Sequence, residues 1–348
     1  MRKVRCYRMS QNIEYFVRGY TGSGEVNYIE SNIEAIKDVY ILKTANEKTA
    51  ELFLKELIKL IDDETIVEVI KHPDYKQALD GIILRERSMA ILTTPFIKYV
   101  SSHTHLIDLT KYTMLPVRFI EQNRKLIIDQ AMNYISTSLE IYEKIREINK
   151  ASMNFEIADE IMNDFIRKEI KAFPALDKEA TVYERMFGTN IPERIVECVD
   201  NLITPIKNRV YLKGAPGSGK SYFLKQIMNV VVDKGYDVEV YRCSFDSSSI
   251  DMIIIREMNY CIFDSSSPHE YDPSKDTDYI VDFLNVLNEN SDNVDEIKEL
   301  SEEYTEKLNS GITHLSKLEE FEGSIKNSKI EFTRQEVETV LKDYKIKL

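Results

Sequence analysis

The chain contains no tryptophan and has only 4 cysteines among its 348 residues. The cysteines lie far apart and form no C-x-x-C pair, which disfavours a zinc site or a disulfide framework and fits a reducing compartment. No apolar run approaches the roughly 18 residues needed to cross a bilayer, and the basic N-terminal stretch leads into no apolar segment. We therefore expect a cytoplasmic protein with no membrane partner.

The chain also lacks an excess of positive charge. Lys plus Arg is 46 and Asp plus Glu is 59, so the formal net charge is −13. A protein whose main task is to bind a phosphate backbone would be basic, so the charge argues against a nucleic-acid partner. The hydrophobic share of 43% is enough for ordinary cores, and the length predicts about two domains.

The most informative segment matches the phosphate-binding pattern G-x-x-x-x-G-K-[ST], from Gly214 to Ser221. Glycines let backbone N–H groups turn towards phosphate oxygens, and the following helix adds its positive N-terminal end. Lys220 is expected at the β- and γ-phosphates and the Ser221 hydroxyl at Mg²⁺. No N-K-x-D guanine-reading motif is present, so ATP is the expected nucleotide. The candidate nucleotide-binding residues are Gly214, Ala215, Pro216, Gly217, Ser218, Gly219, Lys220, Ser221 and Tyr222.

Two further strands are expected after the loop, over residues 237–243 and 260–264. The second is an apolar run ending in Asp264, as in a Walker B element, so Asp264 is the candidate Mg²⁺ partner beside Ser221. Ser265 follows Asp264, where many ATPases have a water-activating Glu, so a general base must come from elsewhere. Asp246, Asp251 and His269 follow the strands at the expected ligand edge. The predicted catalytic set is Lys220, Asp264 and Asp246.

The chain carries an internal repeat. The segments around Lys43 and at 53–55 recur around Lys213 and at 223–225, and those at 67–69 and 79–86 recur at 238–240 and 250–257. The spacing stays constant apart from one gap, so we interpret the chain as a tandem duplication. The expected fold is α/β: two tandem P-loop-type three-layer domains with mainly parallel sheets, each followed by long helices. The first domain spans 1–173 and the second 174–348, with a linker over 174–184.

The first copy has lost the site residues. The segment aligned with the phosphate loop, 44–51, contains no glycine, and its glutamates would repel phosphate. Ala50 takes the place of Lys220, and Thr93 that of Asp264. We expect a P-loop-type fold that binds no nucleotide in its own loop; a Lys48-Thr49 pair standing in for Lys-Ser is the less favoured alternative.

Apolar residues at helical spacing predict long helices over 126–148, 155–170 and 294–321, the last interrupted at Gly311. A final helix is expected from Thr333, with a capping box to Glu336. These arms either pack on each other or on the sheets, or offer a coiled-coil face for a protein partner or self-association.

The segments 212–221, 237–241 with Cys243, and 263–265 with Pro268-His269 resemble an uncharacterised family of bacterial tandem P-loop ATPases. The resemblance implies ATP binding and little beyond it. In that family both copies generally carry a phosphate loop, and the first copy here departs from that pattern.

Three functions are compatible with these residues. The first is an Mg·ATP-dependent ATPase whose nucleotide state acts as a conformational switch, with a pseudo-NTPase first half that could supply a cation from Arg18, Arg85 or Arg87. Since Arg85 recurs as Arg256, a salt bridge within the fold is favoured for it. The second is a small-molecule kinase, and the third is an ATP-binding sensor or scaffold without catalysis.

Overall fold

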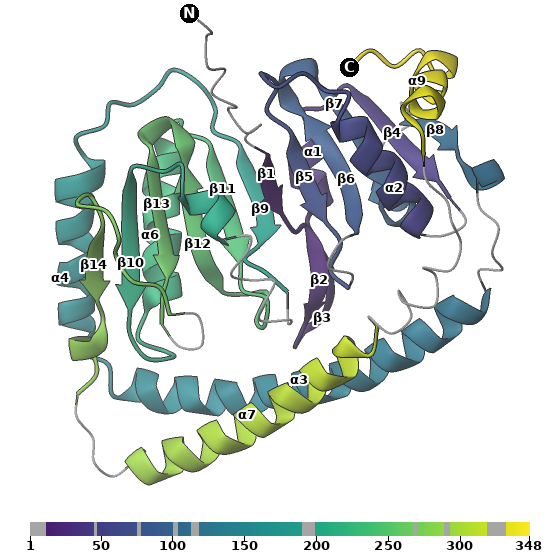
Figure 1. The fold of residues 1–348 in the computed structure, drawn as a ribbon. Helices are drawn as coiled ribbons and strands as arrows, with labels where there is room; N and C mark the ends of the chain where they lie inside the picture. Colours follow the sequence, from purple (N-terminus) through teal and green to yellow (C-terminus); the bar gives the residue numbers. More distant parts are fainter. Residues whose placement is uncertain are drawn as a thin grey trace, which may run out of the picture. The chain divides into compact units, whose positions relative to one another are not determined.

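The computed structural model divides the chain into two compact units, each described here by itself (Figure 1). The first comprises Met1–Val17, Asn32–Lys125 and Lys317–Leu348, and the second Arg18–Ser31 and Leu126–Ser316. The segments of the two units alternate along the chain. The structure describes residues 12–44, 47–74, 78–99, 104–112, 118–189, 199–266, 270–288, 293–318 and 332–348.

The first unit is built on a six-stranded sheet. Its strands, from one edge to the other, are β1 (Ile13–Tyr15), β5 (Glu68–Lys71), β6 (Leu79–Leu84), β7 (Met89–Thr93), β4 (Asp38–Lys43) and β8 (Thr104–Asp108). Short 3₁₀ turns follow β6, β7 and β8 at Arg85–Arg87, Thr94–Tyr99 and Thr110–Tyr112. The inner strands are almost wholly buried, as the apolar runs in their sequence require.

Two helices from distant parts of the chain cover one face of this sheet. Helix α2 (Glu47–Ile58) packs its apolar side on the strands, and α9 (Arg334–Asp343) packs against α2. The rings of Phe53 and Phe332 meet edge to face with centroids 5.4 Å apart. The expected capping box at the start of α9 is confirmed, because Thr333 and Glu336 exchange side-chain-to-backbone hydrogen bonds.

The second unit contains another six-stranded sheet, and a short hairpin of β2 (Arg18–Thr21) and β3 (Gly24–Asn27) belongs to the same unit. Helix α1 (Ile29–Ile33) follows the hairpin in sequence. The strands of the large sheet are, in order, β9 (Val182–Met186), β11 (Val238–Arg242), β12 (Ile250–Ile255), β13 (Tyr260–Asp264), β10 (Asn208–Lys213) and β14 (Tyr279–Asp282). Turns of 3₁₀ helix follow at Arg256–Met258 and Leu284–Val286.

Helix α6 (Lys220–Asp233) lies against this sheet with Phe223, Leu224 and Ile227 buried. Helix α4 (Phe155–Phe165), continued by a π-helical turn at Ile166–Ile170, packs on the outer side of α6. The ring centroids of Phe165 and Phe223 are 5.2 Å apart. The expected helix over 155–170 is therefore confirmed, and the unit's core lies between α6 and the sheet.

The two sheets have the same strand order and the same sense at every pairing. Strand β4 pairs with β7 in parallel, as β10 does with β13, and β5 pairs with β6 antiparallel, as β11 does with β12. The register agrees as well: Val69 faces Ile82 in one sheet, and their equivalents in the repeat, Val240 and Ile253, face each other in the second. The repeat read in the sequence thus coincides with two equivalent sheets.

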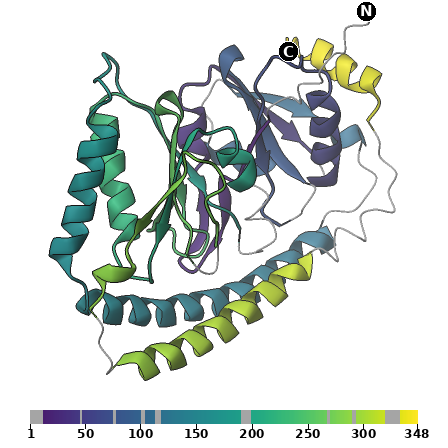
Figure 2. The ribbon, with the colours of Figure 1, turned by 60° about the vertical axis from the view of Figure 1, so that its left-hand side comes forward.

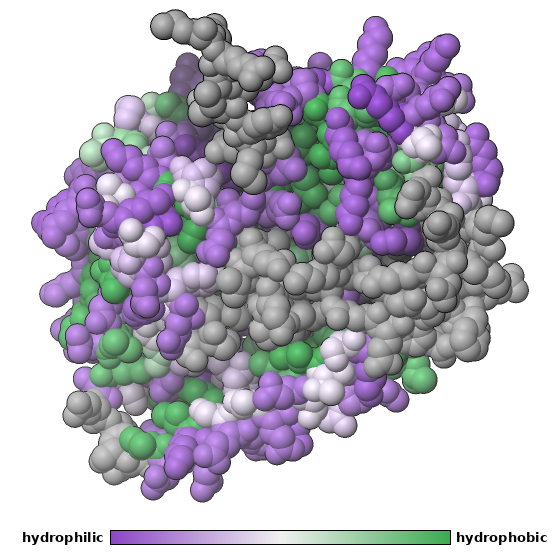
Figure 3. All heavy atoms as spheres, in the orientation of Figure 1, coloured by the Kyte–Doolittle hydropathy of each residue, from purple (hydrophilic) through white to green (hydrophobic). Residues whose placement is uncertain are grey.

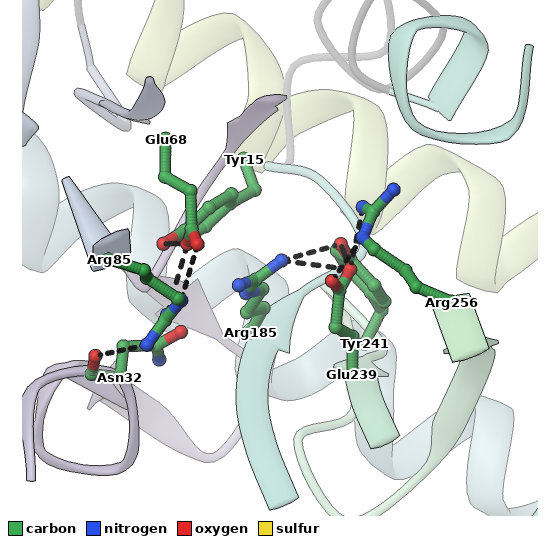
Figure 4. A network of polar contacts seen from close by, with 8 residues as sticks. All are labelled: Tyr15, Asn32, Glu68, Arg85, Arg185, Glu239, Tyr241 and Arg256. Atoms are coloured by element: carbon green, nitrogen blue, oxygen red, sulfur yellow. Dashed lines mark hydrogen bonds and ion pairs between the residues drawn. The ribbon is translucent and has the colours of Figure 1, made fainter. Parts of the chain in front are cut away.

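The same ion pair, between a buried glutamate and a partly exposed arginine, recurs in each sheet (Figure 4). In the first unit Arg85 pairs with Glu68, which also accepts from the Tyr15 hydroxyl at 2.6 Å. In the second, Arg256 Nε lies 2.5 Å from Glu239. The buried Arg185 adds a second cation 2.9 Å from Glu239, so the two arginines lower the pKa of Glu239 although burial opposes this. The expected salt-bridge role of Arg85 is confirmed.

Two expectations about the strands need correction. Residues 250–255, which were not expected to be a separate strand, form β12, and β12 runs antiparallel to both of its neighbours. Each sheet therefore contains both senses of pairing but remains mainly parallel, as expected, with three parallel pairings out of five. The expected linker over 174–184 runs into β9, which pairs with β11 at the sheet edge.

Helix α3 (Arg118–Ala151) has 34 residues, about 50 Å at 1.5 Å per residue, and belongs to the second unit from residue 126 onward. There it runs beside α7 (Val294–Ser316), as Figure 1 and Figure 2 both show. The ring centroids of Tyr142 and Tyr304 are 5.2 Å apart. A Cβ added to Gly311 would lie only 2.6 Å from the Ile135 side chain. The expected interruption at Gly311 is wrong, because α7 continues through this residue, whose missing side chain lets the two helices approach closely.

The face of α7 that is visible in Figure 3 is mainly hydrophilic. The apolar stripe of α7 instead meets α3, so the alternative in which these helical segments pack on each other is the one observed within the unit. Among the residues that the structure describes, no helix combines the length and the hydropathy that crossing a membrane would require.

Candidate functional site

The loop between β10 and α6 turns through two glycines with positive φ. Gly217 and Gly219 adopt φ angles of +80° and +96°, which side chains with a Cβ rarely adopt. Helix α6 begins at the next residue, Lys220, with Gly219 as its N-cap. The first N–H groups of a helix have no partner within the helix, so the loop and this terminus together present donors to an anion.

Lys220 is folded back over this loop. Its Nζ donates to the carbonyl oxygens of Gly214 and of Ala215, the latter at 3.0 Å, and lies 3.5 Å from Asp264 Oδ2. The pairing of β10 with β13 brings these residues together, because Leu212, two residues before the loop, faces Asp264 in the register. The structure thus brings the predicted Lys220 and Asp264 into one site.

The two serines of the motif, Ser218 and Ser221, differ in their hydrogen bonding. Ser221 Oγ accepts a hydrogen bond from the backbone N of Ile250 at 2.8 Å, which joins the start of β12 to the loop. Ser218 is 1% exposed, and its Oγ has no hydrogen-bond partner among the described residues. A buried hydroxyl without a partner costs free energy, which a bound phosphate oxygen would remove. Tyr222, by contrast, is 58% exposed on α6.

Three carboxylates approach the loop from strand ends. Asp264 closes β13 and accepts from the backbone N of Ser266 at 2.9 Å. Asp251 lies on β12. Burial of its carboxyl group, together with the negative charge of Asp264, raises its pKa to about 7. Asp246 follows β11, and its Oδ1 accepts from both the backbone and the hydroxyl of Ser248. Ser265, which replaces the usual Glu, is fully buried.

Helix α3 contributes residues that no sequence motif identifies. Arg146 Nη1 lies 2.6 Å from Asp246 Oδ2, and Asn149 donates from Nδ2 to the Pro216 carbonyl at 2.8 Å. A Cβ on Gly217 would lie 2.6 Å from the carbonyl oxygen of Arg146. No local pattern marks these residues, since they are far from the loop in sequence and belong to an ordinary amphipathic stripe. Only the packing of α3 in the second unit brings them to the loop.

The equivalent place in the first unit has a different form. Helix α2 begins at Glu47, whereas the residue aligned with the first residue of α6 is Ala50, so residues 47–49, which align with 217–219 of the loop, are helical. Glu51 is buried there and pairs with Lys48 at 2.8 Å and Lys55 at 2.7 Å. Thr93, aligned with Asp264, is buried and neutral. In the described part of this segment, from 47 onward, helix takes the place of a glycine-turned loop, and no carboxylate stands at the position of Asp264.

Arg85, Arg87 and His269 are three further residues that the sequence suggested for the nucleotide site. Arg85 is held by Glu68, and Arg87 pairs with Asp62 at 2.5 Å, so the salt bridges of both lie within the first unit. His269 lies outside the described residues.

Comparisons with family models, with curated proteins and with solved structures return no match for this chain.

The site fits a magnesium nucleotide on its own residues. Positive-φ glycines line the loop, and the buried Ser218 hydroxyl has no partner in the part of the chain that the structure describes. Among the described residues no cluster of three or more His, Cys, Asp or Glu is arranged to hold a metal. Mg²⁺ takes one or two protein oxygens and fills its shell with phosphate and water. Ser221 and Asp264 would be those protein ligands.

Proposed function

We propose that the second unit binds Mg·ATP and hydrolyses it as a conformational switch, and that the first unit is a pseudo-NTPase domain from a tandem duplication. The observation that carries the proposal is the pairing of the glycine-turned loop with Lys220 and Asp264 on adjacent parallel strands. Three features typical of a P-loop meet there: the glycine-turned backbone, the lysine and the strand-end carboxylate. Phosphoryl transfer uses these three groups together.

Each residue has a definite role in this proposal. Loop N–H groups bind phosphate oxygens, and Lys220 leaves the loop carbonyls to neutralise the β- and γ-phosphates. Ser221 and Asp264 hold Mg²⁺, which supplies further charge neutralisation at the phosphates. In hydrolysis, water oxygen bonds to the γ-phosphorus as the bond to the β–γ bridging oxygen breaks, and a proton passes to a base.

The base is to be sought between two carboxylates. Asp246, the residue expected from the sequence, has its Oδ2 on Arg146 and its Oδ1 on Ser248. Asp251 has a pKa raised to about 7, which suits proton transfer near neutral pH. If Asp251 is the base, hydrolysis by an Asp251→Asn variant fails more completely than by Asp246→Asn.

Binding of a fluorescent ATP analogue to Lys220→Ala and Lys48→Ala tests the proposal. Lys48 is the matched control, since it is an ion-paired lysine from the aligned segment of the first unit. We expect Lys220→Ala to abolish binding and Lys48→Ala to leave it unchanged. Equal losses in both variants, or no binding by the unmodified protein, would contradict the proposal.

Phosphate release then separates the kinds of function. Release of phosphate without any acceptor supports hydrolysis. ADP formation that depends on an added hydroxyl acceptor would instead favour a small-molecule kinase. Tight binding without turnover would favour an ATP-responsive sensor or scaffold.

A further inference from the structure

Helix α3 is anchored against the phosphate loop at several points. Its Asn149 side chain is hydrogen-bonded to Pro216, and Met153 just beyond its end lies where a Cβ on Gly219 would meet it at 3.1 Å. The segment after α3 is tied down as well, because the backbone N of Asn154 donates to the carbonyl of Val286 at 2.7 Å. Backbone and side chains at this end of α3 are thus held at the rim of the candidate nucleotide site.

Arg146 is the cation that this helix brings to the loop. Its main-chain oxygen touches the place where Gly217 lacks a side chain, and its guanidinium reaches Asp246. One helical turn earlier, Tyr142 packs its ring edge to face on Phe245, next to Asp246, with centroids 5.5 Å apart. Packing on one side and the ion pair on the other therefore define the direction of the Arg146 side chain.

The guanidinium of Arg146 uses only part of its hydrogen-bonding capacity. Both of its contacts among the described residues, to Glu143 at 2.7 Å and to Asp246 at 2.6 Å, run through Nη1. Arginine carries five N–H donors in a planar fork, so the donors on Nε and Nη2 remain for a further acceptor. The side chain is 29% exposed, which leaves those donors accessible.

Charge also favours a phosphate group as this acceptor. Asp246, Asp251 and Asp264 bring three carboxyl groups to the site, and the cations recorded among them are Lys220 and Arg146. Lys220 serves the β- and γ-phosphates from the loop. A terminal phosphate needs a second cation on its far side, and a planar guanidinium matches phosphate oxygens in geometry.

We propose, on the basis of the function proposed above, that Arg146 is the residue by which the second unit distinguishes nucleoside triphosphate from diphosphate. Its Nε and Nη2 donors bind the terminal phosphate, while Asp246 is a positioning residue that holds Nη1. Because Arg146 lies on α3, binding of the terminal phosphate directly changes the contacts of this helix. Diphosphate ends short of Arg146 and leaves it on Asp246 alone.

Affinities for Mg·ATPγS and Mg·ADP, measured by calorimetry on the full chain, test this. Arg146→Ala should bind Mg·ATPγS about 10- to 100-fold more weakly, the range for a lost charge-assisted hydrogen bond, with Mg·ADP binding unchanged. Arg146→Lys should keep part of the preference, because lysine offers a point charge without the fork. Asp246→Ala should also reduce the preference for Mg·ATPγS over Mg·ADP, but by a smaller factor than Arg146→Ala does.

Arg124→Ala is the matched control. Arg124 lies on the same helix and pairs with the buried Asp74 in the first unit, with Nε 3.0 Å from Oδ2, so its loss removes a comparable ion pair away from the loop. It should leave the ratio of the two affinities unchanged. Parallel weakening of both nucleotides in Arg146→Ala, or a preserved ratio, overturns the inference. Failure of the unmodified protein to bind either probe overturns the proposed function first.

Discussion

Arg146 and Asp246 form an ion pair 100 residues apart in sequence, with Nη1 2.6 Å from Oδ2. The pair joins a long helix to the turn after β11, where the sequence makes Asp246 either a candidate general base or a solvated turn residue. The acceptor atoms of Asp246 are shared between Arg146 and Ser248, so the side chain is oriented before any ligand arrives. That arrangement makes Asp246 better suited to position a cation than to take a proton.

The loop glycines give a prediction about stability. Replacing Gly217 by Ala imposes a positive φ on a residue with a Cβ, which costs about 1–3 kcal/mol, and also forces the new Cβ against the Arg146 carbonyl. Gly24→Ala, in the same unit, is the control. Gly24 has a φ of +122°, but a Cβ added there would meet nothing within 4 Å. Chemical denaturation should show a larger loss for Gly217→Ala than for Gly24→Ala, and only Gly217→Ala should lose ATP binding. Equal losses would mean that α3 does not contact the loop closely.

The raised pKa of Asp251 predicts how stability depends on pH. The folded state holds the Asp251 proton more tightly than the unfolded chain does, with a pKa of about 7 against 3.8. Its contribution to the free energy of unfolding is therefore fully present below pH 3.8 and is lost as the pH rises through 7. Asn is neutral at every pH, so Asp251→Asn should be more stable than the unmodified protein at pH 8, by about 1–4 kcal/mol.

The same comparison at pH 4 provides the control for Asp251. At pH 4 Asp251 is neutral in the folded protein and about half ionised in the unfolded chain, so the unfolding free energies of the two proteins should agree within about 1 kcal/mol. The measurements belong in EDTA and without nucleotide, so that only the protein titrates. A stability difference that is the same at pH 4 and pH 8 would contradict the shifted pKa.

Removal of metal gives a prediction for Asp264. With Ser221, Asp264 is the proposed protein ligand of Mg²⁺, so Asp264→Ala should bind ATP in excess Mg²⁺ as weakly as the unmodified protein does in EDTA. Asp282→Ala is the matched control, because Asp282 ends the other parallel neighbour of β10. That variant should keep the full response to Mg²⁺ in a titration of nucleotide affinity. A normal Mg²⁺ response in Asp264→Ala would remove Asp264 from the metal site.

Local patterns predicted those features of the site and of the fold whose residues are close in sequence. The loop from Gly214 to Ser221, the strand ending in Asp264 and the capping box at Thr333 each depend on neighbouring residues, and the structure places all three as expected. The constant spacing of the repeat also anticipated two sheets with one strand order. These features follow from backbone conformation and short-range periodicity, which a sequence displays directly.

Features that depend on distant packing were not predictable in the same way. The apolar run at 250–255 gives no indication of its direction, and only the sheet makes β12 antiparallel. Arg146 has no motif, because its role depends on where α3 packs rather than on its neighbours. The same holds for α9, whose apolar side belongs to the core of the first unit although it follows the second repeat in sequence.

The position of α9 has a consequence for how the chain reaches its folded state. During synthesis, the sheet and α2 of the first unit leave the ribosome long before the segment that covers Phe53 has been translated. Part of that apolar surface must remain exposed to water, or be held by a chaperone, while the whole second repeat is added. The second unit, whose second segment ends before α9, can therefore form before the first unit is complete.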